Sequence, residues 1–175
     1  MSPEVNAGAS VALFLAHAIT LEDEAAERYD ELADVMAVHH NEVEALFRRM
    51  AGYSRLHRDE AQARAAAEAL ALPPLRPWEF AWPAPESPES AALEHTHYLM
   101  DAHQALSLAL AAERQAQAFY RQVAETTADS GVRALATEFA EEEAEHARLL
   151  EAWLAQHPPS SASPGDDLDP PVAID

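Results

Sequence analysis

The sequence predicts an all-α fold, an antiparallel four-helix bundle with one long crossover between the second and third helices. Alanine is abundant and only 4 of the 175 residues are glycine, a composition that favours helices over sheet. Four long segments repeat their apolar residues with the 3.6-residue period of an amphipathic helix. Short links join the first two and the last two segments, whereas a long proline-rich stretch separates the two halves.

The first two predicted helices cover about residues 10–38 and 41–70. Ser10 and Asn41 stand at their starts, and both residue types are favourable N-caps. The link between the two helices, HHN, is short enough to favour a direct reversal of the chain. We therefore expect an antiparallel pair.

The last two predicted helices cover about residues 101–127 and 129–157. Asp101 with Gln104 resembles a capping box, in which two side chains satisfy free backbone N–H groups of the first turn. The link TADS is short, so these helices also form an antiparallel pair. The prolines that follow His157 end the last helix, because proline has no N–H group to donate.

The stretch between the two halves, residues 71–90, reads ALPPLRPWEFAWPAPESPES. A connection of that length is uncommon inside a compact domain. A bundle with one long crossover, the ferritin-like topology, accounts for it. We assign residues 1–157 to this bundle, and residues 158–175, rich in proline, serine and aspartate, to a disordered acidic tail.

The composition argues against several classes of function. The chain has no cysteine, which excludes disulfides and thiolate-held metal centres. A net charge of −20 repels nucleic acid and anionic lipid, so we expect neither as a partner. No run of about 18 uncharged apolar residues is present, so we expect no membrane span. The start, MSPEVNAGAS, lacks the basic region of a signal peptide, and the expected location is the cytoplasm.

Each predicted helix carries an acidic or imidazole side chain in the middle of its apolar stripe. The acids are Glu22 in the first helix, Glu113 in the third and Glu143 in the fourth. The imidazoles are His57 in the second helix and His146 in the fourth. Glu143 and His146 are three residues apart, so a helix projects them from nearly the same side.

The two halves of the chain repeat this pattern. Glu-x6-Tyr occurs at 22–29 and again at 113–120, and a histidine follows the glutamate after 35 residues in the first half and 33 in the second. At a rise of about 1.5 Å per residue, each glutamate and its histidine are level to within about one turn. All four helices would then present these side chains inward at one height.

Clustered carboxylates in a core need a counter-charge, because burying an isolated one costs several kcal/mol. The sequence has no lysine, and we place no arginine on these stripes near that height. A bound metal ion is therefore the expected counter-charge, and carboxylate oxygen with imidazole nitrogen suits iron or manganese, and zinc less selectively. Other glutamates of the first and fourth helices fall off the stripes and are expected on a solvated face: Glu24, Glu27, Glu141, Glu142 and Glu145.

These motifs resemble the rubrerythrin-like branch of the ferritin-like di-iron carboxylate superfamily. The segments LEDEAAERY (21–29) and AERQAQAFY (112–120) are similar to its two Glu-x6-Tyr helices, and FAEEEAEHARLL (139–150) is similar to a Glu-x-x-His helix. The resemblance covers roughly residues 10–156. It implies metal ligands at five positions: Glu22, His57, Glu113, Glu143 and His146.

The second helix departs from the family pattern at one position. In FRRMAGYSRLHRDEA (47–61), Ser54 stands where the family has a bridging glutamate. Three outcomes remain open at this stage. A water or hydroxide fills the gap in a looser two-metal site, a single ion binds among the ligands of the third and fourth helices, or Glu60, one turn beyond His57, swings in.

The resemblance implies a protein that binds two iron ions, with manganese or zinc as alternatives, and acts as an oxidoreductase on peroxide or oxygen. The glutamate and histidine of each half would hold one ion, and Glu143 would bridge the two. Tyr29 and Tyr120 would hydrogen-bond the ligand carboxylates and are the residues assigned to catalysis. Without cysteine the chain lacks the rubredoxin-type iron site of full-length rubrerythrins, so an external electron donor is expected.

Two other functions remain open from the sequence. One is a non-catalytic iron-handling protein of the ferroxidase type, which oxidises or passes on Fe(II). The other is a bundle with a vestigial metal site that binds a protein partner. Apolar faces on long helices also lead us to expect a homodimer.

Overall fold

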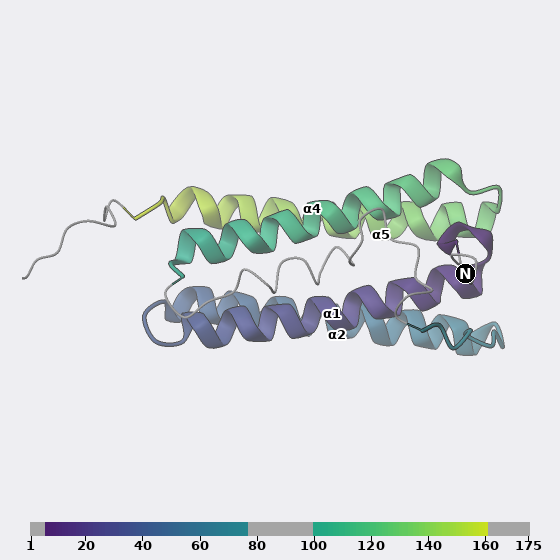
Figure 1. Ribbon diagram of the computed structural model, residues 1–175, viewed down its shortest axis with the longest axis horizontal. Helices are drawn as coiled ribbons and strands as arrows, with labels where there is room; N and C mark the ends of the chain where they lie inside the picture. The colour runs from purple at the N-terminus through teal and green to yellow at the C-terminus, as the bar shows by residue number, and fades with distance from the viewer. Residues whose placement is uncertain (1–5, 77–99, 161–175) are drawn as a thin grey trace, which may run out of the picture.

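Four long α-helices form the computed structural model, which describes residues 6–76 and 100–160 (Figure 1). They are α1 (Val11–Met36), α2 (Asn41–Ala67), α4 (Ala102–Thr126) and α5 (Ser130–Gln156), preceded by the short 3-10 helix η1 (Ala7–Ala9). All four predicted helices are present within a few residues of their expected bounds, and the described residues contain no strand. The prediction of an all-α four-helix bundle is confirmed.

The crossover of residues 71–90 is described only as far as Arg76, and the tail only as far as Ser160. The boundary between the bundle and a disordered tail therefore stays a prediction. Across the described ranges, no helix combines the length and the apolar character needed to cross a membrane.

The starts of the helices follow the predicted caps at two positions and not at a third. The Ser10 hydroxyl accepts a hydrogen bond from the Leu13 N–H group at 3.2 Å, and Asp101 forms the full capping box with Gln104. Asn41 is not an N-cap, so that prediction is wrong: α2 starts at Asn41 itself, and His40 is the cap without a side-chain hydrogen bond. The turn after α1 is the physical reason, because the His40 N–H group donates to the Met36 carbonyl and leaves His40 as the last non-helical residue.

The end of α2 comes three residues earlier than predicted. Ala69 has a φ of 52°, in the left-handed region that interrupts a helix. The Leu70 N–H group then donates back to the Ala65 carbonyl at 2.9 Å, the long bond of a Schellman motif. The helix therefore ends by a standard C-terminal motif, but with alanine at the position that usually holds glycine.

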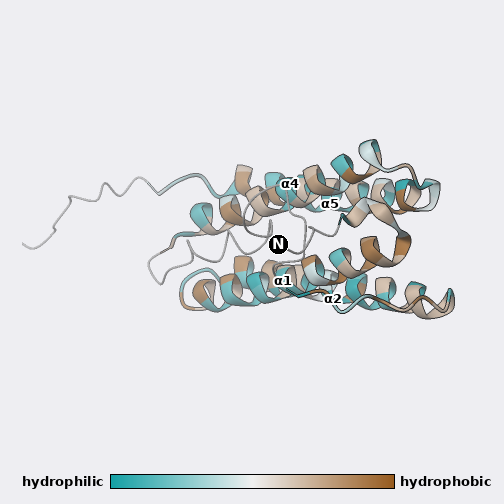
Figure 2. Cartoon of the chain, turned by 45° about the vertical axis from the view of Figure 1, so that its right-hand side comes forward, coloured by the Kyte–Doolittle hydropathy of each residue, from teal (hydrophilic) through white to brown (hydrophobic). Residues whose placement is uncertain are grey.

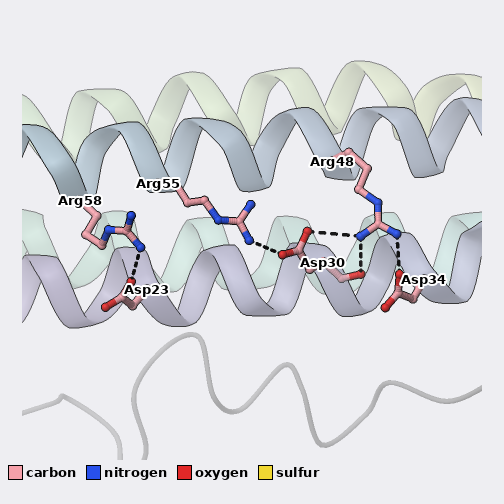
Figure 3. A network of polar contacts seen from close by, with 6 residues as sticks. All are labelled: Asp23, Asp30, Asp34, Arg48, Arg55 and Arg58. Carbon is pink, nitrogen blue, oxygen red and sulfur yellow. Dashed lines mark hydrogen bonds and ion pairs between the residues drawn. The ribbon is translucent and has the colours of Figure 1, made fainter.

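The bundle consists of two antiparallel helical hairpins, α1 with α2 and α4 with α5 (Figure 1). A ladder of ion pairs lies along the outside of the first hairpin, where Arg58 pairs with Asp23 at 2.8 Å and Arg55 and Arg48 both pair with Asp30 (Figure 3). These pairs are largely exposed, so each contributes little to stability. They do favour one alignment of α1 along α2, because the aspartates on α1 and the arginines on α2 meet only in that alignment.

The core is divided into two apolar clusters, one towards each end of the bundle. The first contains Phe14, Leu15 and Phe139, and the second contains Phe47 and Leu150 together with neighbours from all four helices. Hydrophobic and hydrophilic residues alternate along every helix, as amphipathic packing requires (Figure 2). Between the two clusters the helices bring polar residues inward, and this middle level is the candidate site.

Candidate metal centre

A layer of polar side chains from all four helices separates the two apolar clusters. We call it the polar layer and define it by these residues: Glu22, Arg28 and Tyr29 of α1, Ser54 and His57 of α2, Glu113 and Tyr120 of α4, and Glu142, Glu143 and His146 of α5. All five metal ligands expected from the sequence belong to this layer. The three glutamates are buried and the two histidines are half-buried.

The closest group in this layer is formed by Glu113, Glu143 and His146. One ligand atom from each lies within 4.8 Å of those of the other two. The Nδ1 atom of His146 is 3.5 Å from a carboxylate oxygen of Glu113 and 3.5 Å from one of Glu143. Two donor atoms bound to one ion at about 2.1 Å each lie at most about 4.2 Å apart, so these separations permit a shared ion.

The three residues of this group shift one another's pKa values in the metal-free protein. Burial raises the pKa of Glu143 well above its usual range, and the nearby charge of Glu113 adds to the effect. Burial also opposes ionisation of Glu113, but contacts with Glu143 and His146 and the charge of Arg28 outweigh it and lower the pKa of Glu113. The pKa of His146 rises to about 11, because contacts with the two carboxyl groups overcome its burial. Glu113 is therefore the carboxyl group of the two that ionises more readily, and His146 lies within 3.5 Å of both.

Glu22 and His57 lie beside this group and complete the set expected from the sequence. The Nδ1 atom of His57 is 3.8 Å from a carboxylate oxygen of Glu22, and the imidazole ring stacks on that of His146 with centroids 5.4 Å apart. Burial raises the pKa of Glu22, whereas contact with Glu22 raises that of His57. The two histidines therefore connect the glutamate of α1 to the group on α4 and α5.

Arg28 contradicts the expectation that no arginine lies near this level. Its side chain is fully buried, and one guanidinium nitrogen is 3.3 Å from a carboxylate oxygen of Glu113. The sequence contains a signal that would have found it, since Leu21, Ala25, Arg28 and Leu32 form a second buried stripe at helical spacing on α1. The helix buries a wider face than one stripe, because it contacts both its hairpin partner and the other hairpin. Arg28 supplies one positive charge to a layer that holds several carboxyl groups.

The two tyrosines of the repeat are both fully buried but have different surroundings. The Tyr29 hydroxyl donates a hydrogen bond to the Glu113 oxygen that also faces Arg28. The Tyr120 hydroxyl has no hydrogen-bond partner among the described residues. Tyr29 thus contacts a candidate ligand carboxylate in the way the resemblance implies, and Tyr120 does not.

Glu142 is the second residue that sequence reasoning misplaced. It was expected on a solvated face, but its side chain is only 31% exposed, and a carboxylate oxygen lies 3.8 Å from the Nδ1 atom of His57. Phe139, Glu142 and His146 are spaced by three and four residues, which is the signal that would have placed Glu142 at the edge of the buried face. Glu60, considered as a replacement ligand, is exposed.

The donor set fits a metal ion of the iron, manganese or zinc class. Carboxylate oxygen and imidazole nitrogen are the ligands these ions take in helical bundles. The Nδ1 atom of His57 is buried without a hydrogen-bond partner among the described residues, although two carboxylates lie close by. A buried nitrogen without a partner is costly unless something binds it. Arg28 offsets part of the negative charge and leaves the remainder for a cation or for protons.

The comparisons with known proteins agree with the fold. Residues 101–171 match the model of the ferritin-like domain family. A crystal structure of an uncharacterized conserved protein from Magnetospirillum magnetotacticum MS-1 has a TM-score of 0.71 and 42% sequence identity to this chain. The similarity covers 88% of this chain and 99% of that protein. None of the curated proteins matches the chain significantly. The chain belongs to the ferritin-like superfamily.

Proposed function

We propose that the protein binds metal ions in its polar layer, with two iron ions as the physiological load, and that it acts as a rubrerythrin-like oxidoreductase on peroxide or oxygen. The observation that carries metal binding is the convergence of Glu113, Glu143 and His146 within 4.8 Å in a buried layer. Membership of the ferritin-like superfamily supports the choice of a carboxylate-held metal.

The proposal assigns a role to each residue of the layer. Glu113 and His146 would hold one ion, Glu22 and His57 the other, and Glu143 would lie between them. Tyr29 would orient Glu113, because its hydroxyl donates to one carboxylate oxygen and leaves the other oxygen facing His146.

Two bound ferrous ions would supply two electrons. Together with two protons, these electrons reduce one molecule of hydrogen peroxide to two molecules of water. The protein would keep bulk water out through the apolar clusters on either side of the layer. Since the chain has no cysteine, an external donor would restore the electrons.

Elemental analysis of protein purified without chelator tests metal binding. We expect roughly one to two equivalents of metal, and a Glu143→Ala variant should lose most of it, because it removes one of the three ligands that lie closest together. Glu141→Ala is the matched control, since Glu141 is an exposed neighbour on the same helix. Unchanged metal content in Glu143→Ala would refute the site.

Peroxide-driven oxidation of the reduced, iron-loaded protein tests the reaction. Rapid loss of ferrous iron with peroxide consumed in proportion supports the oxidoreductase. Loss of ferrous iron to oxygen followed by release of the oxidised iron supports iron handling of the ferroxidase type instead.

The second candidate is a bundle whose site no longer binds metal and which serves partner binding. One observation favours it: the buried Arg28, 3.3 Å from a carboxylate oxygen of Glu113, already offsets the charge of that carboxylate without a metal ion. Absence of metal after purification and after reconstitution with ferrous, manganous and zinc ions would establish this reading. The homodimer expected from the sequence stays a prediction, which sedimentation equilibrium tests.

A further inference from the structure

The polar layer has a gap on α2 and an unassigned carboxylate opposite it on α5. Ser54 is buried, with 3% of its surface exposed, at the position where a glutamate is expected. Its hydroxyl is too short to replace a carboxylate that reaches across the bundle. His57, one turn further along α2, keeps its inward direction. The second group of ligands therefore has an imidazole and the glutamate of α1, but no carboxylate from α2.

Glu142 lies next to this incomplete group. One of its carboxylate oxygens is 3.8 Å from the Nδ1 atom of His57, the same distance that separates this atom from Glu22. The imidazole nitrogen is thus placed between two carboxylates from different helices. Each distance is too long for a hydrogen bond but short enough for a pair of donor atoms that share an ion at about 2.1 Å each. Among the described residues only Glu113, Glu143 and His146 bring three ligand atoms within 4.8 Å of one another, so the partly exposed Glu142 would turn towards Glu22 when an ion binds.

The Tyr120 hydroxyl provides a second and independent observation. It is fully buried and has no hydrogen-bond partner among the described residues. Burial raises the pKa of Tyr120, and the charges of Glu22, Glu143 and Glu142 raise it further. A buried donor without a partner, seven residues after Glu113 on the same helix, indicates a polar layer that the described side chains alone do not complete.

Partial exposure of Glu142 is also consistent with a ligand role. Its neighbours Glu141 and Glu145 are exposed, and Glu60 on α2 is exposed as well. Of the carboxylates near His57 other than Glu22, Glu142 is therefore the one that faces the layer.

We propose that Glu142 replaces the carboxylate that α2 lacks, so that Glu22, His57 and Glu142 hold a second metal ion beside the one held by Glu113, Glu143 and His146. This inference rests on the proposed metal binding. The missing ligand of the second ion would then come from α5, and this helix would bind both ions through the adjacent residues Glu142 and Glu143.

The test is the stoichiometry of Co(II) binding, measured by calorimetry and by the visible absorption of the bound ion in the full chain. We expect two equivalents for the unmodified protein and one for Glu142→Gln, which keeps the shape of the side chain and removes its charge. Glu141→Gln is the matched control and should keep two equivalents. Adding Ser54→Glu to Glu142→Gln should restore the second equivalent, because it returns a carboxylate to α2 one turn before His57.

Each alternative result has a defined meaning. Two equivalents in Glu142→Gln, or equal losses in Glu142→Gln and Glu141→Gln, would overturn the inference. One equivalent in the unmodified protein would also overturn it, together with the two-ion load, while leaving metal binding by Glu113, Glu143 and His146 intact, and none would overturn metal binding as well. Circular dichroism checks folding, and Glu142→Ala repeats the measurement with a good helix former if the first variant does not fold.

Discussion

At the scale of single residues, Arg28 determines the electrostatic state of the polar layer. A fully buried guanidinium beside Glu113 gives the layer one permanent positive charge, which protonation cannot remove. Its stem also fills space between the helices, so its removal affects packing as well as charge.

Arg28→Met should destabilise the metal-free protein by about 3 kcal/mol or more, because it leaves the Glu113 carboxylate buried without its guanidinium partner. Chemical denaturation in the presence of chelator measures the loss. The control is Arg114→Met, which breaks the exposed pair with Glu151 and should cost far less. Equal effects of the two substitutions would contradict the role assigned to Arg28.

Tyr29 and Tyr120 form a matched pair for measuring one hydrogen bond. Tyr29→Phe removes a bond to the ionised Glu113 and should cost about 1.5–3 kcal/mol of stability in the metal-free protein. Tyr120→Phe removes a hydroxyl with no partner among the described residues and should change stability by less than about 0.5 kcal/mol. Thermal and urea unfolding with chelator compare the two. A larger loss for Tyr120→Phe would contradict the assigned contacts.

At the scale of single elements, the end of α2 carries local strain. Ala69 adopts a φ of 52°, where a side chain other than glycine is disfavoured. Its conformation is maintained by the backbone bonds of the Schellman motif and by the packing of Leu70 against the first apolar cluster.

Ala69→Gly should therefore stabilise the protein by about 0.5–1 kcal/mol, because glycine adopts this conformation without steric cost. Ala118→Gly, at an exposed position inside α4, should destabilise it by about 1 kcal/mol for the opposite reason. Urea denaturation of both variants provides the comparison, and opposite signs are the expected result. A loss of stability in Ala69→Gly would contradict the strain.

At the scale of the whole molecule, the polar layer lies where the two hairpins meet. The group with the closest ligand atoms lies within the α4–α5 hairpin, whereas Glu22 and His57 belong to the α1–α2 hairpin. Metal bound to both groups would link the hairpins, and binding to the folded state alone would raise stability by about 2.7 kcal/mol at a hundredfold excess over Kd.

Metal binding should release protons, and its affinity should rise with pH. Contacts with Glu113 and Glu143 raise the pKa of His146 to about 11 despite burial, so His146 holds a proton at neutral pH when no metal is bound. Burial also raises the pKa of Glu143, which makes this carboxyl group harder to ionise. Metal needs the deprotonated forms, which gives about a tenfold gain in affinity per pH unit for each proton displaced. Calorimetry in buffers of different protonation enthalpy counts these protons, and a buffer-independent heat would contradict the prediction.

The same pKa values determine the sign of a stability change. Because the pKa of His146 is raised from 6.5 to about 11, the folded state binds more protons than the unfolded state between these values. The contribution of His146 is complete below about pH 6.5 and is lost as the pH rises towards 11. The metal-free protein should therefore unfold at lower urea concentration as the pH rises through this range, and saturating metal should reduce the trend.

The sequence alone determined the four helices, their pairing into two hairpins and the level at which polar residues turn inward. These features depend on local periodicity, on caps such as Asp101 and on link length, all of which are readable along one chain. The inward direction of Glu22, Glu113 and Glu143 followed from the same periodicity.

Only the tertiary structure decided which polar groups contact one another. The burial of Arg28 and the approach of Glu142 to His57 depend on how far each helix is rotated against two neighbours, and a single apolar stripe does not specify that rotation. Likewise, the repeat made Tyr29 and Tyr120 equivalent in sequence, but within residues 6–76 and 100–160 only the Tyr29 hydroxyl has a carboxylate as hydrogen-bond partner. The periodicity of the sequence determines in which direction a side chain leaves its own helix. The packing between helices determines which other side chain it contacts.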